Sequence, residues 1–215
     1  MIFNKESATK VAQSLLQIKA IKLQPANHFT WASGWKSPIY CDNRKILSYP
    51  KVRTFVRQQF VEAIENKYPN VDVIVGVATG GIAIGALIAE DMGLPFCYVR
   101  SAAKGHGMQN LIEGEVPTGK NVVVVEDLIS TGGSSLKAVD ALRESDCEVL
   151  GMVAIFTYDF DLAKENFKEK KCKLVVLSDY NALIKTAEAD NYVSEKDIKS
   201  LTEWRVSPSE WSPKK

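Results

Sequence analysis

The stretch from residue 121 to residue 135 constrains this chain more than any other, because it joins an apolar run to an acidic pair and a glycine loop. Val122 to Val125 are four consecutive β-branched residues, which predict a strand buried on both faces. Glu126 and Asp127 follow at once, at the carboxyl end of that strand, where open α/β sheets bind their ligands. We therefore predict an α/β protein whose ligand site lies at this end of the sheet.

A loop of hydroxyl-bearing residues and glycines, Ser-Thr-Gly-Gly-Ser-Ser over residues 130–135, comes next. Glycines let the backbone turn sharply and present its N–H groups to an anion. Leu136, Val139 and Leu142 recur at helical spacing, so a helix with a positive dipole end begins at this loop. Two adjacent carboxylates repel an anion unless they bind sugar hydroxyls or a metal. The stretch predicts a phosphate cradle with a rim that binds a diol.

Two common nucleotide-binding motifs do not fit this stretch. The loop lacks the Gly-Lys-Ser/Thr ending of a Walker loop, and the chain has no G-x-G-x-x-G dinucleotide fingerprint. A structural turn between a strand and a helix would explain the glycines, but it would not explain the acidic pair.

Composition predicts a single cytoplasmic domain over residues 1–215. The net charge of +1 does not favour nucleic acid or an anionic membrane as the main partner. Four cysteines without a C-x-x-C spacing and only two histidines make a zinc site improbable and fit a reducing compartment. The first residues have no signal-peptide layout. The uncharged run 73–89 breaks at Thr79-Gly80-Gly81, which favours a strand, a turn and a helix over a membrane span.

The remaining periodicities predict a central, mostly parallel sheet flanked by helices, with a core at about 50–180 and a small N-terminal hood at about 20–45. We expect helices over residues 6–20, 53–68, 82–92, 160–171, 181–188 and 194–204. We expect further strands over residues 71–77, 95–99, 149–157 and 173–177, with a β excursion over 111–119.

Two further loops carry candidate chemistry. Ala78, Thr79, Gly80 and Gly81 repeat the strand–loop–helix layout and would place a second anion at a helix N-terminus. Glycines and small residues over 100–110 predict a mobile loop, in which Arg100, Lys104 and His106 supply three cations. Such a lid suits a reaction with an anionic leaving group, although a solvated basic loop is the more common explanation of the charges.

The central stretch resembles the phosphoribosyl pyrophosphate (PRPP) motif of the type I phosphoribosyltransferases. The resemblance implies that fold, with Glu126 and Asp127 on the ribose hydroxyls and the loop on the 5′-phosphate. The PRPP-binding residues that it implies are Glu126, Asp127, Leu128, Ile129, Ser130, Thr131, Gly132, Gly133 and Ser134. It also implies that residues 78–81 hold the pyrophosphate.

The segment 29–44, with Phe-Thr, Ser-Gly and Ser-Pro-Ile-Tyr, is similar to the hood of those members of the family that use orotate. The resemblance implies that the orotate site includes Ser130, Tyr40, Cys41, Lys36, Arg44 and Tyr158. Ala32, Gly80, Ser101 and Tyr158 stand where many such members carry cations, and we expect Lys36 and Arg44 to replace part of that charge.

The resemblance implies transfer of the phosphoribosyl group from PRPP to orotate, which gives orotidine 5′-phosphate and pyrophosphate. Mg²⁺ is the expected cofactor, without direct protein ligands. A homodimer is implied, in which the loop of one subunit reaches the active site of the other, with Arg100, Lys104 and His106 as catalytic residues. A phosphoribosyltransferase for another nucleobase, or a non-catalytic PRPP sensor, are the alternatives.

Overall fold

The computed structural model describes residues 1–31, 34–101, 111–115 and 118–211, and it places a six-stranded sheet at the centre of the chain. The strands lie in the order β10-β9-β8-β5-β6-β7, and only β7 is antiparallel to its neighbour. Their bounds are β5 (Val73–Val77), β6 (Phe96–Val99), β7 (Ile112–Glu113), β8 (Asn121–Ile129), β9 (Glu148–Thr157) and β10 (Leu174–Asp179). The predicted α/β class and the mostly parallel sheet are confirmed.

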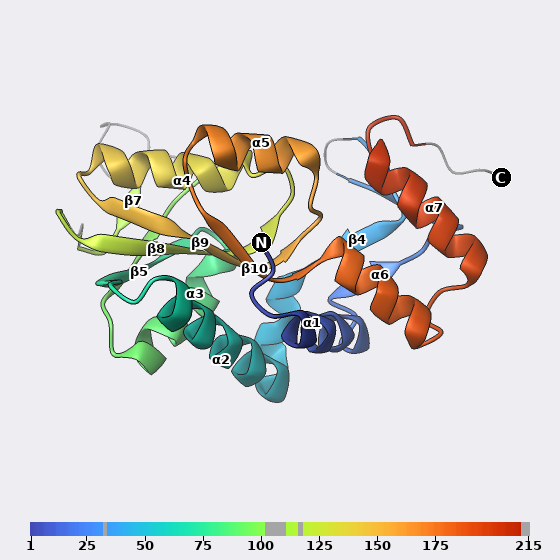
Figure 1. Cartoon of the computed structure of the whole chain (residues 1–215), viewed down its shortest axis with the longest axis horizontal. Coiled ribbons are helices and arrows are strands. Elements are labelled where there is room, and N and C mark those ends of the chain that lie inside the picture. Colours follow the sequence, from blue (N-terminus) through green and yellow to red (C-terminus); the bar gives the residue numbers. More distant parts are fainter. Residues whose placement is uncertain (32–33, 102–110, 116–117, 212–215) are drawn as a thin grey trace.

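Helices cover both faces of this sheet (Figure 1). One face carries α1 (Lys5–Gln17), α2 (Pro50–Lys67) and α3 (Gly80–Met92), and the other carries α4 (Gly133–Glu144) and α5 (Asp161–Glu169). The run 73–89 forms β5 and most of α3, as predicted. No helix among the described residues combines the length and apolarity that crossing a membrane requires.

The four valines of β8 explain why one strand holds the sheet's two hydrophobic layers together. Val123 and Val125 pack into the cluster that contains Phe60 and Ile84, whereas Val122 and Val124 pack into the opposite cluster with Leu136 and Val139. The opposite cluster lies on the α4 side of the sheet. All four valines are fully buried, which confirms the predicted two-sided burial.

The strand β8 is longer than predicted, because it continues through the acidic pair to Ile129. On one side its pairing with β5 stops at Val125, opposite Gly76. On the other side its pairing with β9 continues, with Ile129 opposite Thr157. Glu126 and Asp127 therefore lie where β8 has lost one neighbour and still has the other.

The direction of winding also reverses between β5 and β8. The chain leaves β5 through α3 to reach β6 on one side, and it leaves β8 through α4 to reach β9 on the other. Such a reversal opens a crevice at the carboxyl ends of the two strands, because the helices that follow them lie on opposite faces. The fold thus places the acidic pair at this crevice.

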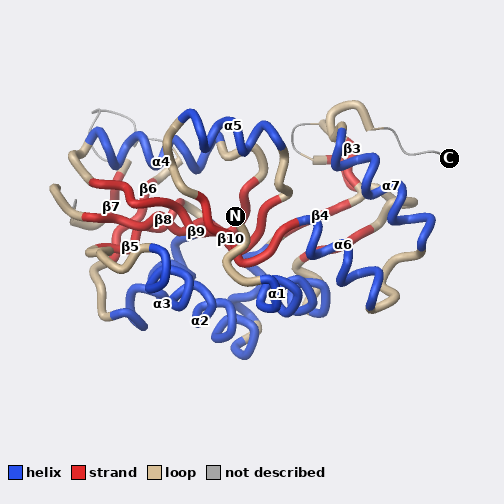
Figure 2. The backbone as a smooth tube through the Cα atoms, viewed as in Figure 1, coloured by secondary structure: helices blue, strands red, loops and turns tan. Residues whose placement is uncertain are grey.

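The N-terminal hood consists of two small antiparallel pairs, and it lies beside the last two helices (Figure 2). β1 (Ile21–Leu23) pairs with β4 (Ile39–Cys41), β2 (Phe29–Thr30) pairs with β3 (Lys36–Ser37), and the 3₁₀ turn η1 (Asn43–Ser48) follows. The helices are α6 (Tyr180–Ala189) and α7 (Glu195–Val206), and α7 begins with the predicted capping box of Ser194 and Asp197. Trp31 of the hood lies edge-on to Trp204 of α7, with ring centroids 5.6 Å apart.

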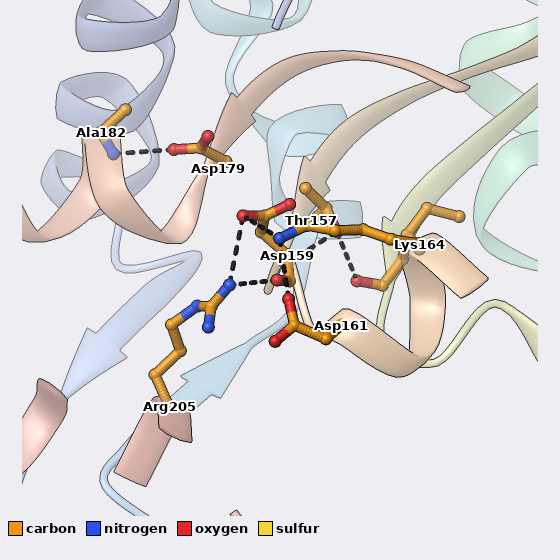
Figure 3. Close-up of polar contacts among 8 residues, drawn as sticks. Thr157, Asp159, Asp161, Lys164, Asp179, Ala182 and Arg205 are labelled. Carbon is orange, nitrogen blue, oxygen red and sulfur yellow. Dashed lines mark hydrogen bonds and ion pairs between the residues drawn. The ribbon is translucent and has the colours of Figure 1, made fainter. Parts of the chain in front are cut away.

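A polar cluster ties α7 to the turn after β9 (Figure 3). The Arg205 guanidinium donates to the backbone oxygen of Asp159 and, at 3.2 Å, to its carboxylate. Lys164 Nζ lies 3.2 Å from the same carboxylate. The backbone N–H of Asp159 donates to Thr157 Oγ1 at 3.0 Å, which fixes the turn in which Asp159 has a positive φ of 56°.

Replacing Arg205 with alanine is expected to lower the free energy of unfolding by about 1–3 kcal/mol, since it removes charge-assisted bonds from a half-buried carboxylate. Urea unfolding followed by tryptophan fluorescence measures this change. Lys199→Ala, an exposed change on the same helix, is the matched control and should stay within about 0.5 kcal/mol of the parent. Equal losses in both variants would contradict the assigned role of Arg205.

Candidate active site

A pocket of about 360 Å³ opens at the crevice between β5 and β8. The carboxyl ends of both strands, the turn into α3 and the hood contribute to its walls. The lining residues are Cys41, Asp42, Arg44, Val77, Ala78, Thr79, Gly80, Glu126, Asp127, Leu128 and Ser134. This pocket, called the donor pocket below, brings together the acidic pair and both predicted phosphate loops.

Glu126 points toward the start of α4 and is almost buried, with 6% of its surface exposed. The hydroxyl of Ser135 donates to its Oε2 at 2.8 Å, and the N–H of Asp127 donates to its Oε1 at 3.0 Å. Burial, and then the charge of Asp127, raise the pKa of Glu126 to about 8. The acidic pair therefore holds less negative charge near neutral pH than its two carboxyl groups suggest.

Asp127 lies against the other loop. A Cβ built on Gly80 would be 2.3 Å from Asp127 Cγ, so a side chain fits at position 80 only if the carboxylate moves. A Cβ on Gly81 would be 2.2 Å from the backbone oxygen of Val125. The turn into α3 therefore packs closely against β8, with the backbone of Val125 at Gly81 and the side chain of Asp127 at Gly80.

Two helix N-termini face the donor pocket. α3 begins at Gly80 after Thr79, and α4 begins at Gly133 after Gly132, which has a φ of 81°. Neither helix has a side-chain cap on its first N–H groups. Uncapped N–H groups and the positive end of a helix dipole bind phosphate, so the backbone supplies two anion sites on opposite sides of the acidic pair.

A second pocket of about 330 Å³ adjoins the first, and both pockets are lined by Cys41 and Leu128. Three of its lining residues are aromatic, and the complete lining is Thr30, Trp31, Tyr40, Cys41, Leu128, Ser130 and Tyr158. The ring of Tyr158 lies 5.3 Å from that of Trp31 and is stacked at 5.5 Å on Phe160. Burial raises the pKa of the Tyr158 phenol, so this side chain is a neutral wall. We call this the acceptor pocket.

The two hood cations lie at different pockets. Lys36 donates from Nζ to Thr30 Oγ1 at 2.8 Å, and Thr30 lines the acceptor pocket. Arg44 lines the donor pocket and is paired with Asp42, with Nε 2.8 Å from Oδ1. The structure thus places Arg44 away from the acceptor pocket for which the sequence proposed it, because the 3₁₀ turn η1 carries it past Asp42 toward β8.

The other predicted residues lie in the acceptor pocket or the core, away from both pockets, or outside the described residues. Ser130 lines the acceptor pocket, whereas Ile129 is fully buried and offers only its backbone. Arg100 follows β6 and pairs with Glu113 at 3.3 Å, away from the lining of both pockets. Lys104 and His106 lie outside the described residues, as does Ala32.

Sequence reasoning missed two asparagines that hold the backbone between the acidic pair and the glycine loop. Asn43 is fully buried, and its Nδ2 donates to the backbone oxygen of Asp127 at 2.7 Å. Asn166 Nδ2 donates to the backbone oxygen of Thr131 at 2.9 Å. Both contacts span long stretches of sequence, and no local pattern in the sequence indicates them.

Comparison with known proteins identifies the relatives of this site. The model of the phosphoribosyl transferase domain family matches residues 44–191. The chain is 59% identical to the orotate phosphoribosyltransferase of Phocaeicola vulgatus over 93% of this chain and 94% of the relative. It is 58% identical to the orotate phosphoribosyltransferase of Bacteroides fragilis, over the same shares of both chains.

A solved structure of an orotate phosphoribosyltransferase has a similar fold. The orotate phosphoribosyltransferase of Aeropyrum pernix superposes with a TM-score of 0.75 at 27% identity, over 86% of this chain and 99% of the other. The family model, the identity of the relatives and the shared fold agree with the two adjoining pockets. This chain belongs to the phosphoribosyl transferase domain family and, within it, to the orotate phosphoribosyltransferases.

Proposed function

We propose that this protein transfers the phosphoribosyl group of PRPP to orotate, giving orotidine 5′-phosphate and pyrophosphate in pyrimidine biosynthesis. The observation that carries the proposal is the continuity of the donor pocket and the acceptor pocket through Cys41 and Leu128. One pocket has an acidic rim between two helix N-termini, which suits a sugar with two phosphate groups. The other has aromatic walls, which suit a planar ring.

The donor is held by three parts of the chain. The N-terminus of α4, with Ser134, takes the 5′-phosphate, and the N-terminus of α3 takes the pyrophosphate. Glu126 and Asp127 take the ribose hydroxyls. The bond from C1 of the ribose to pyrophosphate breaks through an oxocarbenium-like state, in which negative charge grows on the leaving group. N–H groups fixed at the start of α3 stabilise that charge without rearrangement.

The acceptor enters from the hood side. Tyr40 and Tyr158 flank the pyrimidine, and Ser130 offers a hydroxyl in the lining of the acceptor pocket. Orotate loses its ring proton readily and becomes the nucleophile, so we assign no protein base. Its carboxylate needs a cation. Lys36 lies next to this pocket, because it donates to Thr30 of the lining, and we assign it this role.

Mg²⁺ and the loop 100–110 complete the proposal. Mg²⁺ prefers phosphate oxygens and water with few protein ligands, and its charge would offset that of pyrophosphate. Asp127 and Asp42 supply oxygens in the donor pocket that fit such a water-mediated role. We further propose a cytoplasmic homodimer in which Arg100, Lys104 and His106 serve the leaving group of the neighbouring subunit, as the resemblance implies.

An absorbance assay of orotate consumption with PRPP and Mg²⁺ tests the function directly. We expect turnover with orotate. With uracil, hypoxanthine or adenine, the rate of pyrophosphate release should be much lower than with orotate. Asp127→Asn should lower kcat/KM for PRPP roughly 10- to 100-fold, since it removes a charged partner of a hydroxyl. Asp146→Asn, on a surface turn that tolerates asparagine, should leave it unchanged. PRPP binding without turnover on any base would favour the sensor alternative.

The two hood cations should separate kinetically. Lys36→Ala is expected to raise KM for orotate by roughly tenfold, the effect of losing a charge-assisted hydrogen bond, with KM for PRPP unchanged. Arg44→Ala should act on KM for PRPP instead, because Arg44 lines the donor pocket. Steady-state kinetics with each substrate varied in turn measure both constants, and Lys22→Ala on β1 is the control. An unchanged KM for orotate in Lys36→Ala would rule out its assigned role.

The raised pKa of Glu126 predicts a stability difference that depends on pH. A folded-state pKa above the unfolded value means that folding favours the protonated form, so this contribution is full below about 4.5 and is lost as pH rises through about 8. Glu126→Gln should therefore match the parent near pH 5 and exceed its unfolding free energy above pH 8. Each unit of the pKa shift corresponds to about 1.4 kcal/mol. Urea unfolding across this range measures the difference.

Glu144→Gln, an exposed change at the end of α4, controls for the loss of one negative charge. A trend with pH that both variants share would assign the effect to net charge and not to the burial of Glu126.

A further inference from the structure

A cavity of about 520 Å³ lies outside the two substrate pockets and is larger than either of them. It lies between α5 and β10, at the edge of the sheet where the first residues of the chain pair with β10. Val176 donates from its N–H to the oxygen of Met1 at 3.0 Å, and Phe3 donates from its N–H to the oxygen of Val176 at 3.0 Å. The proposed reaction makes no use of this cavity.

The floor of the cavity is apolar and includes two aromatic side chains. Its apolar lining residues are Met1, Ile2, Phe160, Ala163, Phe167, Cys172, Leu174 and Val176. The helix α5 supplies Ala163 and Phe167 to this floor, and β10 supplies Leu174 and Val176. A floor of this kind accommodates a planar ring.

The rim of the cavity is cationic, with Lys164, Lys168, Lys171 and Lys173 in its lining. The two carboxylates of the lining are already engaged (Figure 3). Asp159 binds Arg205 and Lys164, and Asp179 Oδ1 accepts the N–H of Ala182 at 2.8 Å.

Three of the lysines remain available. Within the described part of the chain, Lys168, Lys171 and Lys173 have no ion-pair partner. The cavity therefore offers a positive rim over an apolar floor, a combination that fits an anion carried on a ring.

The back wall of the cavity is also the support of the phosphate loop. A Cβ on Gly132 would lie 2.7 Å from Phe167 Cε2, so the ring of Phe167 touches the loop on one side and the cavity on the other. Asn166, the next residue on α5, donates to the oxygen of Thr131. Thr157 lines the cavity and donates from Oγ1 to the oxygen of Ile129 at 3.2 Å. One layer of side chains separates the cavity from the loop.

We propose that this cavity binds a small aromatic anion, a ring that carries a phosphate or sulfonate group, and that its occupancy changes the affinity of the phosphate loop for PRPP. The binding half of the proposal is independent of the proposed function, and the coupling half rests on it. Any ligand that shifts Phe167 or α5 acts on Thr131 and Gly132 through direct contacts.

The binding half is tested with the fluorescent dye 8-anilinonaphthalene-1-sulfonate, an aromatic sulfonate, titrated against the full chain with saturating PRPP and Mg²⁺ present. We expect saturable one-to-one binding. The triple variant K168E/K171E/K173E should weaken it by about tenfold, the combined effect of three exposed charges. K51E/K67E/K185E changes the net charge equally at exposed lysines elsewhere and should leave it unchanged.

A milder variant protects this test against misfolding. K168Q/K171Q/K173Q removes the charges without reversing them and should give an intermediate affinity. Equal weakening in the two glutamate triples would overturn the site.

The coupling half is tested by calorimetric titration of PRPP with Mg²⁺, with and without saturating dye. A several-fold shift in PRPP affinity in the parent, absent from K168E/K171E/K173E at the same dye concentration, is expected. An unchanged PRPP affinity in the parent would overturn the coupling. Failure of PRPP to bind under either condition would overturn the proposed function and leave the dye result standing.

Discussion

The close approach of the β5–α3 turn to β8 is the constraint on which the rest of the site depends. Gly81 leaves room for the backbone oxygen of Val125, and Gly80 leaves room for the carboxylate of Asp127. A side chain at position 81 would push the turn away from β8, because the atom that it meets belongs to the backbone. The crevice made by the reversal of winding becomes a site because two glycines allow its walls to meet.

The distribution of charge follows from that arrangement. Among the residues that line the donor pocket, Arg44 is the one cation, and Asp42 already pairs with it. Within the described part of the chain, the positive potential of this pocket therefore comes largely from backbone N–H groups at two helix ends, which are fixed before a ligand arrives. The lining of the acceptor pocket also lacks a cation, and its Tyr158 wall is neutral. Lys36 lies next to this lining and donates to Thr30.

The sequence allowed the fold and the donor half of the site to be predicted, because their signals are local. The four valines, the acidic pair and the glycine loop lie within fifteen consecutive residues, and period and turn chemistry are read directly there. The end of β8 could not be predicted, because its pairing with β9 decides it. Asn43 and Asn166 were missed for a similar reason: each side chain acts on a carbonyl far away in sequence. The placement of Arg44 depends on a 3₁₀ turn that periodicity does not indicate.

The sharing of β8 between two hydrophobic layers has a consequence for local motion. Alternate valines of β8 belong to opposite hydrophobic layers. The strand is therefore released only when both layers open. Amide protons of residues 122–125 should accordingly exchange with solvent only through global unfolding, the slowest class of native-state hydrogen exchange. The acidic pair thus directly follows, on the same strand, the segment that we expect to open last.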